Sequence, residues 1–425
     1  MVWQGKVRMR ATELPARLGA GETLSFAQMG AALSPLLPLL SRLEGTPQDA
    51  RWHAEGHVAA HSALVVQEAY ALAAAASLSG PDRAALLLAS ALHDIGKALT
   101  TREEPDEAGN IRLRSPGHAR RGRDHLAFRL LDAGWPPNLL LTVLRLVAEH
   151  HRLHRALDGH LERGVPALAR RVSLPLLTLL ARADARGRTV LGDDARRGED
   201  TADLLELAAR ELGVWNAADP HADFRAEVQA LLPGASPDLL ALALGRGLRD
   251  WEAGLIHTPH EAAARVQEAA RHGFPRLTVL CGPSGSGKST LAAQSPQAHV
   301  VSLDALRAKL GRDHTDQRVN GQVMQAAREA VRAGLRRKGH VVWDAGSLRR
   351  DQRGQVLALG EAYGALTRIE VAWTPPSVFS ARNAARRQPV PSAVLSAQLG
   401  SLEFPDPAEA HAVTLHAPDA ESWAL

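Results

Sequence analysis

The apolar positions divide the chain into a long helical part and a shorter part in which strands alternate with helices. Helical periodicity begins near Glu55 and continues to about Ala185, through segments rich in alanine and leucine. It returns between Asp203 and Ala270. The stretch between these helical regions, Arg186–Thr201, is dense in glycine, arginine and aspartate and is expected to form a loop. These patterns predict an all-α domain followed by a helical connector.

The pattern changes after residue 273. A short apolar run, Leu277–Leu280, precedes a glycine-rich loop, and a helix is expected to begin at Lys288. Three further runs have the composition of buried strands: His299–Leu303, His340–Trp343 and Arg368–Trp373. Because helical sequence separates these runs, they predict a parallel sheet flanked by helices.

The sequence therefore predicts a multidomain protein. An N-terminal extension (1–50) precedes an all-α helical bundle (51–200), a helical connector (201–272) and an α/β domain with a parallel sheet (273–425). The chain has 425 residues, of which 45% are hydrophobic, and this is enough for two or three separate cores.

Charge and cysteine content narrow the classes of protein to consider. From Phe274 onward, the sequence contains eighteen lysines and arginines but only thirteen aspartates and glutamates. This excess of positive charge suits an anionic ligand. The single cysteine, Cys281, excludes an internal disulfide and is typical of a reducing compartment. Since no run of eighteen apolar residues occurs, we expect no membrane association and a cytoplasmic location.

The glycine-rich loop has the spacing that wraps the phosphates of a nucleotide. Its glycines let backbone N–H groups converge on phosphate oxygens, Lys288 adds a point charge, and Ser289 offers a hydroxyl ligand to Mg²⁺. A chance glycine-rich turn is the alternative, and the strand–loop–helix setting disfavours it. ATP or another NTP with Mg²⁺ is the expected cofactor, bound by Gly282, Gly285, Ser286, Gly287, Lys288, Ser289 and Thr290.

Phosphoryl transfer also needs a group that orients the attacking oxygen. Asp304 closes the second strand candidate, Arg307 follows three residues later, and Asp344 ends the third strand candidate. In parallel sheets the carboxyl ends of the strands form the ligand crevice. Taken alone, each residue is as readily a helix cap or a surface ion pair. A basic segment with Arg382 and Arg386 could neutralise charge on the transferring phosphoryl group. Taken alone, however, it is interpreted as a solvated helix face.

Together these motifs resemble the 5′-hydroxyl polynucleotide kinase module of phage and bacterial end-repair enzymes. The resemblance implies that Asp304 is the general base, while Arg307 grips the phosphate 3′ of the acceptor nucleotide and Asp344 orients Arg307. Arg382 and Arg386 would be lid arginines on the donor, followed by Val390-Pro391. The sequence departs from the family where Ala345-Gly346-Ser347 replaces the Thr-Asn often seen after the strand-terminal aspartate.

A second set of residues suggests metal chemistry in the helical part. The motif His93-Asp94-Ile95-Gly96-Lys97 follows an apolar helix, and His61 lies in register with apolar residues of an earlier helix. Asp184 occupies an otherwise apolar stripe, where a carboxylate is unfavourable unless it is paired or binds a metal. His118 and either His150 or His151 are further candidates, and helical angles do not separate these last two.

The order of these residues resembles the HD phosphohydrolase superfamily. The sequence around them is similar to the HD domain attached to some tRNA nucleotidyltransferases. That spacing makes His61 the first ligand rather than His53 or His57. The resemblance implies one or two divalent transition metals such as Mn²⁺, Ni²⁺ or Co²⁺, with a bound water that attacks phosphorus. Lys97 would neutralise a phosphate oxygen. The implied metal ligands are His61, His93, Asp94, His118, His150 and Asp184.

The combination of both halves resembles the bacterial HD-Pnk end-healing family. This implies a kinase that transfers a phosphate from an NTP to a 5′-OH end. It also implies an HD half that removes 2′,3′-cyclic, 2′- or 3′-phosphate ends. The partners would be RNA or DNA ends, held through backbone contacts without sequence readout, and a separate nucleic-acid ligase.

Three alternatives stay open. The chain could join a small-molecule or nucleoside kinase to an HD nucleotide phosphohydrolase, or it could be a regulatory tRNA-binding module. A toxin-like kinase acting on a cell-wall sugar nucleotide is the third, and no sugar-binding signature supports it. The sequence leaves open the preference for RNA or DNA, the preferred NTP and the oligomeric state.

Overall fold

The chain divides into two units, Met1–Pro220 and His221–Leu425, in the computed structural model, which describes residues 9–189, 197–312, 317–419 and 421–425. The division falls inside residues 201–272, the expected connector. Helix α11 (Arg197–Glu211) packs against α10 (Leu174–Arg186) of the first unit. Helices α12 to α15 belong to the second unit.

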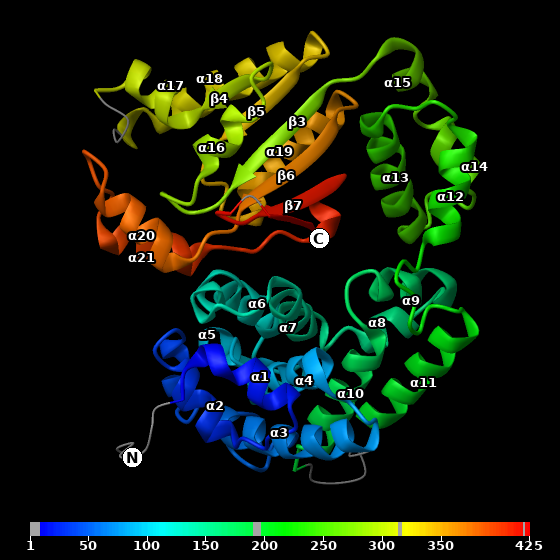
Figure 1. Cartoon of the computed structure of the whole chain (residues 1–425), viewed down its shortest axis with the longest axis vertical. Helices are drawn as coiled ribbons and strands as arrows, with labels where there is room; N and C mark the ends of the chain where they lie inside the picture. Colours follow the sequence, from blue (N-terminus) through cyan, green and yellow to red (C-terminus); the bar gives the residue numbers. More distant parts are fainter. Residues whose placement is uncertain (1–8, 190–196, 313–316, 420) are drawn as a thin grey trace. The chain divides into compact units, whose positions relative to one another are not determined.

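The first unit is a helical bundle built around α4 (Gly80–Leu92) (Figure 1). Every residue of α4 from Ala84 to Leu92 is buried, because α3 (Val58–Ala75), α7 (Pro137–Glu149) and α10 pack against it. An apolar helix of this kind is stable only inside a core, where its burial supplies the free energy of folding. The remaining helices of the bundle are α5 (Lys97–Thr100), α6 (His118–Arg129), α8 (Leu153–Leu157), α9 (Leu161–Ala169) and the short η3 (Leu130–Ala133).

The N-terminal segment belongs to the core of this bundle. It forms η1 (Ala11–Glu13), α1 (Leu14–Gly19), α2 (Phe26–Leu33) and η2 (Pro38–Arg42). Helix α1 packs on α4, and the side chains of Leu14, Leu18 and Met29 are fully buried. Residues 9–50 carry no motif, but they contribute apolar area that shields α4 from water.

Two local features of the first unit differ from the sequence-based expectation. The helical region contains an antiparallel hairpin, β1 (Arg102–Pro105) and β2 (Ile111–Arg114), which was not predicted because its strands are short and rich in charge. The predicted C-terminal boundary of the loop Arg186–Thr201 was wrong, because α11 already begins at Arg197. Glu199 and Asp200 lie in the first turn of α11, where acidic residues interact favourably with the helix dipole. Residues 190–196 of that loop lie outside the described residues.

One described helix, α3, is long and apolar enough to cross a membrane by length and composition. The pair Leu161–Ala169 and Leu174–Arg186 reaches that length only together, with a bend of 94° between them. Helix α3 packs on α4 and α10 and carries His61 on its buried face, as the core helix of a bundle does.

The second unit begins with four helices, α12 (Ala222–Leu231), α13 (Pro237–Glu252), α14 (Pro259–Ala264) and α15 (Gln267–His272). They share an apolar core with the sheet, in which Phe224, Val228 and Leu242 pack with Leu366 of the fourth strand in sequence order. The side chains of Ser236 and Thr258 accept hydrogen bonds at the N-termini of α13 and α14, where backbone donors lack helical partners.

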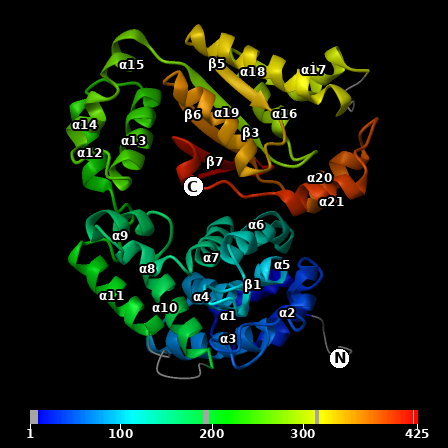
Figure 2. The ribbon, with the colours of Figure 1, turned by 180° about the vertical axis from the view of Figure 1, so that it is seen from behind.

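Among the described residues, the sheet of the second unit has six strands in the order β4-β5-β3-β6-β7-β8, and the first five run parallel. This confirms the predicted α/β domain. Figure 2 labels β5, β3, β6 and β7 of this sheet. The strands are β3 (Arg276–Cys281), β4 (His299–Ser302), β5 (His340–Asp344), β6 (Leu366–Ala372), β7 (Ala412–His416) and β8 (Ser422–Ala424). Strands β7 and β8 were not predicted. Strand β8 pairs antiparallel to β7.

Helices alternate with the parallel strands, as the crossover connection of a parallel pair requires. They are α16 (Lys288–Ala293), α17 (Leu303–Leu310), α18 (Asn320–Arg336), α19 (Arg350–Ala362), α20 (Pro376–Ala384) and α21 (Ser392–Ser401), with η5 (Gln317–Val319) and η6 (Pro407–Glu409). Strand β3 lies between β5 and β6, so the loop after β3 opens at the centre of the carboxyl edge of the sheet.

Candidate functional site

Five helices of the first unit bring the predicted metal ligands together. His61 comes from α3 and Asp184 from α10, whereas His93 and His150 cap the C-termini of α4 and α7, and His118 begins α6. All five side chains are buried. Residues separated by more than a hundred positions thus meet inside one bundle.

Three of the histidines are oriented by the same kind of hydrogen bond to the backbone. The Nδ1–H groups of His93, His118 and His150 each donate to the backbone carbonyl three residues earlier, at 2.9, 2.8 and 2.8 Å. This hydrogen bond fixes the tautomer and leaves the lone pair of Nε2 for another partner. A second hydrogen bond of this kind is usual for histidines that bind metals.

Asp94 lies between two groups of imidazoles. Its Oδ2 is 3.4 Å from His93 Nε2 and 3.6 Å from His61 Nε2. Its Oδ1 is 3.1 Å from His118 Nε2 and 3.9 Å from His150 Nε2. Two groups of candidate ligand atoms share the Asp94 carboxylate, and a third, made of His53, Glu55 and His61, adjoins them through His61. We call the whole cluster the HD centre.

Asp184 lies at the side of the HD centre. Its Oδ1 is 3.0 Å from His61 Nε2 and 3.8 Å from His93 Nε2. The guanidinium of Arg188, one turn later on the chain, donates to both oxygens of Asp184. The structure thus brings Asp184 to the centre, as the sequence predicts, and adds an arginine that stabilises its negative charge.

Lys97 is also at the centre. Its Nζ lies 2.7 Å from Asp94 Oδ2 and donates to Gln48 Oε1 at 2.6 Å. Because the ammonium group reaches the carboxylate shared by both ligand groups, it is well placed to contact an anionic substrate group there.

Two residues of the site were missed or left open by sequence reasoning. Glu55 Oε1 lies 3.0 Å from His61 Nδ1 and 2.8 Å from His53 Nδ1, but no motif marks this carboxylate. His151 Nε2 lies 3.1 Å from His118 Nε2, so both members of the pair His150 and His151 reach the centre. Helical periodicity alone could not distinguish His150 from His151, because both border the same apolar helix face.

Burial and charge shift the acid–base properties of these groups. Burial disfavours the charged form of Asp94, but Lys97 and His93 outweigh it and hold the carboxyl pKa well below its usual range. Burial also disfavours protonated His61, yet Asp184 and Glu55 outweigh it and raise the His61 pKa to about 9. Burial keeps the pKa of His150 well below its ordinary value. A divalent cation among these groups would favour neutral imidazoles instead.

The residues of the HD centre fit a metal. The buried Nε2 of His93 makes no hydrogen bond within the described residues, and the Asp94 carboxylate has charged or imidazole neighbours but no hydrogen bond of normal geometry. A buried polar atom without a partner is unfavourable by about 1–3 kcal/mol, and a coordinated cation removes that penalty. Imidazole nitrogens with carboxylate oxygens suit divalent transition metals, and the two adjoining groups provide for one or two ions.

The phosphate-binding loop lies between β3 and α16 in the second unit. Gly285 and Gly287 have φ values of +85° and +111°, which L-residues with side chains rarely adopt. A Cβ on Gly285 would come within 2.7 Å of the carbonyl oxygen of Phe379. The Gly282 N–H donates to the carbonyl of Gly346 at 3.0 Å. These glycines are therefore required by the backbone itself.

Lys288 begins α16, and its surroundings define the reacting region. Burial lowers the pKa of Lys288, and Asp344 and Asp304 oppose that shift while Arg386 adds to it. The four side chains are therefore close enough to interact electrostatically. Lys288 Nζ donates to the carbonyl of Pro283 at 2.9 Å. Ser286 is buried nearby, whereas the first turn of α16 exposes Ser289 and Thr290.

Asp304 and Arg307 lie on α17, just after β4. Arg307 Nη1 donates to Asp304 Oδ1 at 2.8 Å; the carboxylate is 76% exposed and the guanidinium only 10%. Resemblance implied Asp344 as the partner that orients Arg307, and the ion pair seen here is with Asp304. Asp344, at the end of β5, has its pKa raised by burial against the opposing effect of Lys288.

The basic segment covers the last turn of α20 and the residues just after that helix. Arg382 Nη1 donates to the carbonyl of Ser286 at 3.5 Å, and Arg386 comes just after the helix, with both side chains exposed. Asn383 closes the loop that carries Arg386, because its amide donates to the carbonyl of Val390 at 2.8 Å and accepts from the Val390 N–H at 3.0 Å. The structure thus explains why an asparagine lies between the two arginines.

A residue of α21 braces the phosphate-binding loop and was not anticipated. Gln398 Oε1 accepts from the Ser284 N–H at 2.8 Å, and its Nε2 donates to Ser284 Oγ at 3.1 Å. Its position 114 residues after Ser284 leaves no sequence signal, so only the fold reveals it.

Comparison with known proteins agrees with this division. Residues 58–189 match the family model described as HD domain, and residues 277–405 match the model described as AAA domain. The chain is also similar to proteins named multifunctional CCA protein, here from three organisms. The one from Verminephrobacter eiseniae is 32% identical over 63% of this chain and 56% of its own length. Those from Thioalkalivibrio sulfidiphilus and Alkalilimnicola ehrlichii are 30% and 34% identical, over 49% and 38% of this chain and 46% and 37% of their own.

The chain thus spans about half the length, or less, of the curated relatives it matches. Each family model falls within one of the two units of the fold. The chain joins a helical HD domain to a P-loop domain of the AAA type.

Proposed function

We propose that this protein heals nucleic-acid ends, with the second unit phosphorylating 5′-OH ends and the HD centre removing 2′,3′-cyclic, 2′- or 3′-phosphates. The observation that supports the proposal is a buried histidine–aspartate cluster in one unit and a domain with the spacing of a phosphate-binding loop in the other. Ligation requires a 3′-OH and a 5′-phosphate. A chain that strips phosphate with one site and adds it with the other prepares both ends. A separate nucleic-acid ligase would complete the repair.

In the kinase half, backbone N–H groups of the loop hold the phosphates of ATP or another NTP, and Ser289 contributes a ligand to Mg²⁺. Lys288 lies against the transferred group. Asp304 orients the 5′-hydroxyl and accepts its proton, while Arg307 binds the phosphate 3′ of the acceptor nucleotide. Arg386 stabilises the charge that develops on the transferring phosphoryl group.

In the HD half, His61, His93 and Asp94 would hold one divalent cation, and Asp94, His118 and His150 would hold a second where two bind. Such a cation would supply Lewis-acid chemistry at the phosphate. Glu55 positions His61 through Nδ1, which leaves Nε2 for the metal. Asp184 Oδ1 lies 3.0 Å from that Nε2 and would be a ligand of the same cation. Lys97 moves from Asp94 to a phosphate oxygen of the substrate and stabilises its charge.

Two observations support a nucleic-acid end over a small molecule. Asp304, the proposed base, is 76% exposed, and an open acceptor position suits the end of a polymer better than a metabolite that must be enclosed. The similar proteins carry the name multifunctional CCA protein, which suits an RNA end as the substrate of the HD half.

Competition between two acceptors tests the kinase assignment. With limiting ATP, a short 5′-OH oligonucleotide should take the phosphate in large excess over thymidine, since thymidine lacks the phosphate proposed to contact Arg307. Arg307→Ala should lower transfer to the oligonucleotide much more than transfer to thymidine, which can lose only the effect of the Arg307–Asp304 ion pair. Equal or better transfer to thymidine in the wild type would establish a nucleoside kinase instead.

A further inference from the structure

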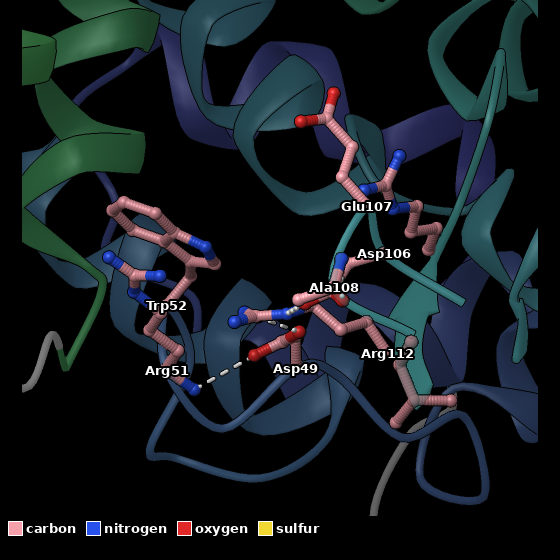
Figure 3. A pocket seen from close by; sticks show the side chains of 9 residues that line it. Asp49, Arg51, Trp52, Asp106, Glu107, Ala108 and Arg112 are labelled. Atoms are coloured by element: carbon pink, nitrogen blue, oxygen red, sulfur yellow. Dashed lines mark hydrogen bonds and ion pairs between the residues drawn. The ribbon is translucent and has the colours of Figure 1, made fainter. Parts of the chain in front are cut away.

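The first unit has an open cavity of about 540 Å³, to which neither the motifs nor the comparisons assign a role. Asp49, Arg51 and Trp52 line it on one side, from the segment before α3 (Figure 3). The β1–β2 hairpin lines the other side. The volume lies within the range of about 300–1,000 Å³ that is usual for small-ligand sites.

One wall of the cavity continues into the HD centre through Gln48. This residue directly precedes Asp49, and its Oε1 accepts a hydrogen bond from Lys97 Nζ at 2.6 Å. Lys97 Nζ in turn lies 2.7 Å from Asp94 Oδ2. Two consecutive contacts therefore join Gln48, the neighbour of Asp49 in the cavity wall, to the carboxylate shared by both ligand groups.

The opposite wall reaches the centre through Ser115, the residue after Arg114. Its carbonyl accepts from His118 Nδ1 at 2.8 Å, so the end of the hairpin fixes the orientation of a candidate ligand. The Ser115 hydroxyl also bonds to Thr101 Oγ1 at 2.8 Å, which closes the base of the hairpin. A substrate that presents a phosphate to the centre would have the adjoining part of its structure between these walls.

The cavity offers an aromatic face and two cations. The Arg51 guanidinium lies 5.1 Å from the centre of the Trp52 ring. Arg112 forms ion pairs with carboxylates on both walls, since its Nε lies 2.9 Å from Asp106 and its Nη1 3.6 Å from Asp49. Within the described part of the chain, Arg51 and Arg114 are exposed and have no carboxylate partner, so both are available to an anion.

We propose that this pocket binds the nucleotide whose phosphate is presented to the HD centre. The base stacks on Trp52, and Arg51 and Arg114 bind the adjoining backbone phosphate. Stacking on an aromatic face accepts any base, which gives binding without sequence readout. The inference rests on the proposed function of the HD half and deepens it, since it assigns the part of the site that distinguishes a nucleotide from a simple phosphate ester.

Substitution of Trp52 separates this role from metal chemistry. We expect Trp52→Ala to raise KM for a 5′-phosphorylated RNA with a 2′,3′-cyclic phosphate end about tenfold, because a stacked base is lost. Metal-dependent hydrolysis of p-nitrophenyl phosphate, which has no base or backbone, should change less than twofold. Trp52→Phe should restore the RNA KM to within about threefold of the wild type.

A second arginine–tryptophan pair in the same unit supplies the control. Arg210 lies 4.9 Å from the ring centre of Trp215, outside the cavity lining. Trp215→Ala should leave both substrates unaffected. Equal losses with both substrates in Trp52→Ala, or an unchanged RNA KM, would overturn the pocket assignment.

Photocrosslinking tests the pocket without relying on turnover. An RNA with a 5′-phosphate and a 3′-terminal 4-thiouridine should crosslink to peptides that contain Trp52 or Arg112–Arg114 in the full-length protein. Crosslinks found only elsewhere would contradict the proposal. If they map to the pocket while no RNA terminal phosphate is ever removed, the pocket stands and the end-healing function fails.

Discussion

The HD centre and the phosphate-binding loop handle the same chemical group, but they are assembled in opposite ways. The ligands of the HD centre come from five helices and from positions 61 to 184. The loop contacts lie within nine neighbouring residues, from Gly282 to Thr290. The first site therefore depends on the packing of a whole bundle around α4. The second depends mainly on the backbone conformation of one strand–loop–helix unit.

The two sites also differ in exposure. The HD centre is buried, and its histidines are held by backbone carbonyls before any ligand arrives. In the second unit Asp304, Arg382 and Arg386 are exposed. A buried, preorganised centre needs little rearrangement to act, whereas exposed arginines must order on the donor. Loss of the carboxylate shared by the two ligand groups should therefore have the largest effect.

Asp94→Ala is expected to have the largest effect. Because this carboxylate belongs to both ligand groups, its removal should lower hydrolysis of 2′,3′-cyclic phosphate ends at least ~10³-fold and reduce bound metal. Phosphorylation of 5′-OH ends should stay within twofold. Metal content and both activities are measured on the same protein, with Asp94→Asn as the variant that preserves shape. Retention of full phosphatase activity after metal removal would refute the metal-dependent mechanism.

Lys288→Ala should give the reciprocal result. Loss of the charge beside the transferred phosphate is expected to lower end phosphorylation ~10³-fold and to leave the HD activity unchanged. Transfer of labelled phosphate from ATP to an oligonucleotide measures the effect. Lys309→Ala, on the partly exposed surface of α17, serves as a matched lysine control. A parallel fall in HD activity would show that the two sites are not independent.

Asp304→Ala tests the proposed base at the exposed site. General base catalysis typically contributes a factor of ~10²–10⁴, and we expect a loss of about 10² in kcat, because the carboxylate is open to solvent. Asp304→Asn should be equally impaired, since it retains the shape of the side chain but cannot accept the proton. A kcat equal to that of the wild type in either variant would show that another group activates the hydroxyl.

Glu55→Gln should have the smallest effect of the four. The carboxylate contacts His61 Nδ1 at 3.0 Å and does not belong to the ligand group His61, His93 and Asp94, so we expect it to position a ligand of that group. Loss of such a partner typically weakens metal affinity ~10–100-fold, and we expect about tenfold. Metal titration followed by activity gives the shift, and excess metal should restore kcat. Failure of excess metal to rescue would indicate a different role for Glu55.

The same contrast explains what the sequence could predict. The phosphate-binding loop was recognisable because glycines required by positive φ values lie next to one another in the chain. The HD ligands were recognisable only in part. His93 and Asp94 form a motif, but Glu55 has no neighbouring signal, and His150 and His151 border the same helix face. Contacts made across a bundle are a property of tertiary packing and not of local pattern.

The fold followed a similar rule. Long apolar helices and buried strands were predicted from periodicity, whereas the charged β1–β2 hairpin and the short β7 and β8 were not. The hairpin is held by pairing and by the Thr101–Ser115 contact rather than by a buried face. Gln398, which braces the phosphate-binding loop from α21, shows the same dependence on distant contacts.

The most direct test of two opposed phosphate activities uses one RNA with a 5′-OH and a 2′,3′-cyclic phosphate. The full-length protein is incubated with this RNA, ATP, Mg²⁺ and Mn²⁺ or Ni²⁺, and both termini are then analysed. The account predicts a 5′-phosphate and a free 3′-OH on the same molecule, with Asp94→Ala blocking only the 3′ change and Lys288→Ala only the 5′ change. An RNA left unaltered at either end by the wild-type protein would contradict it.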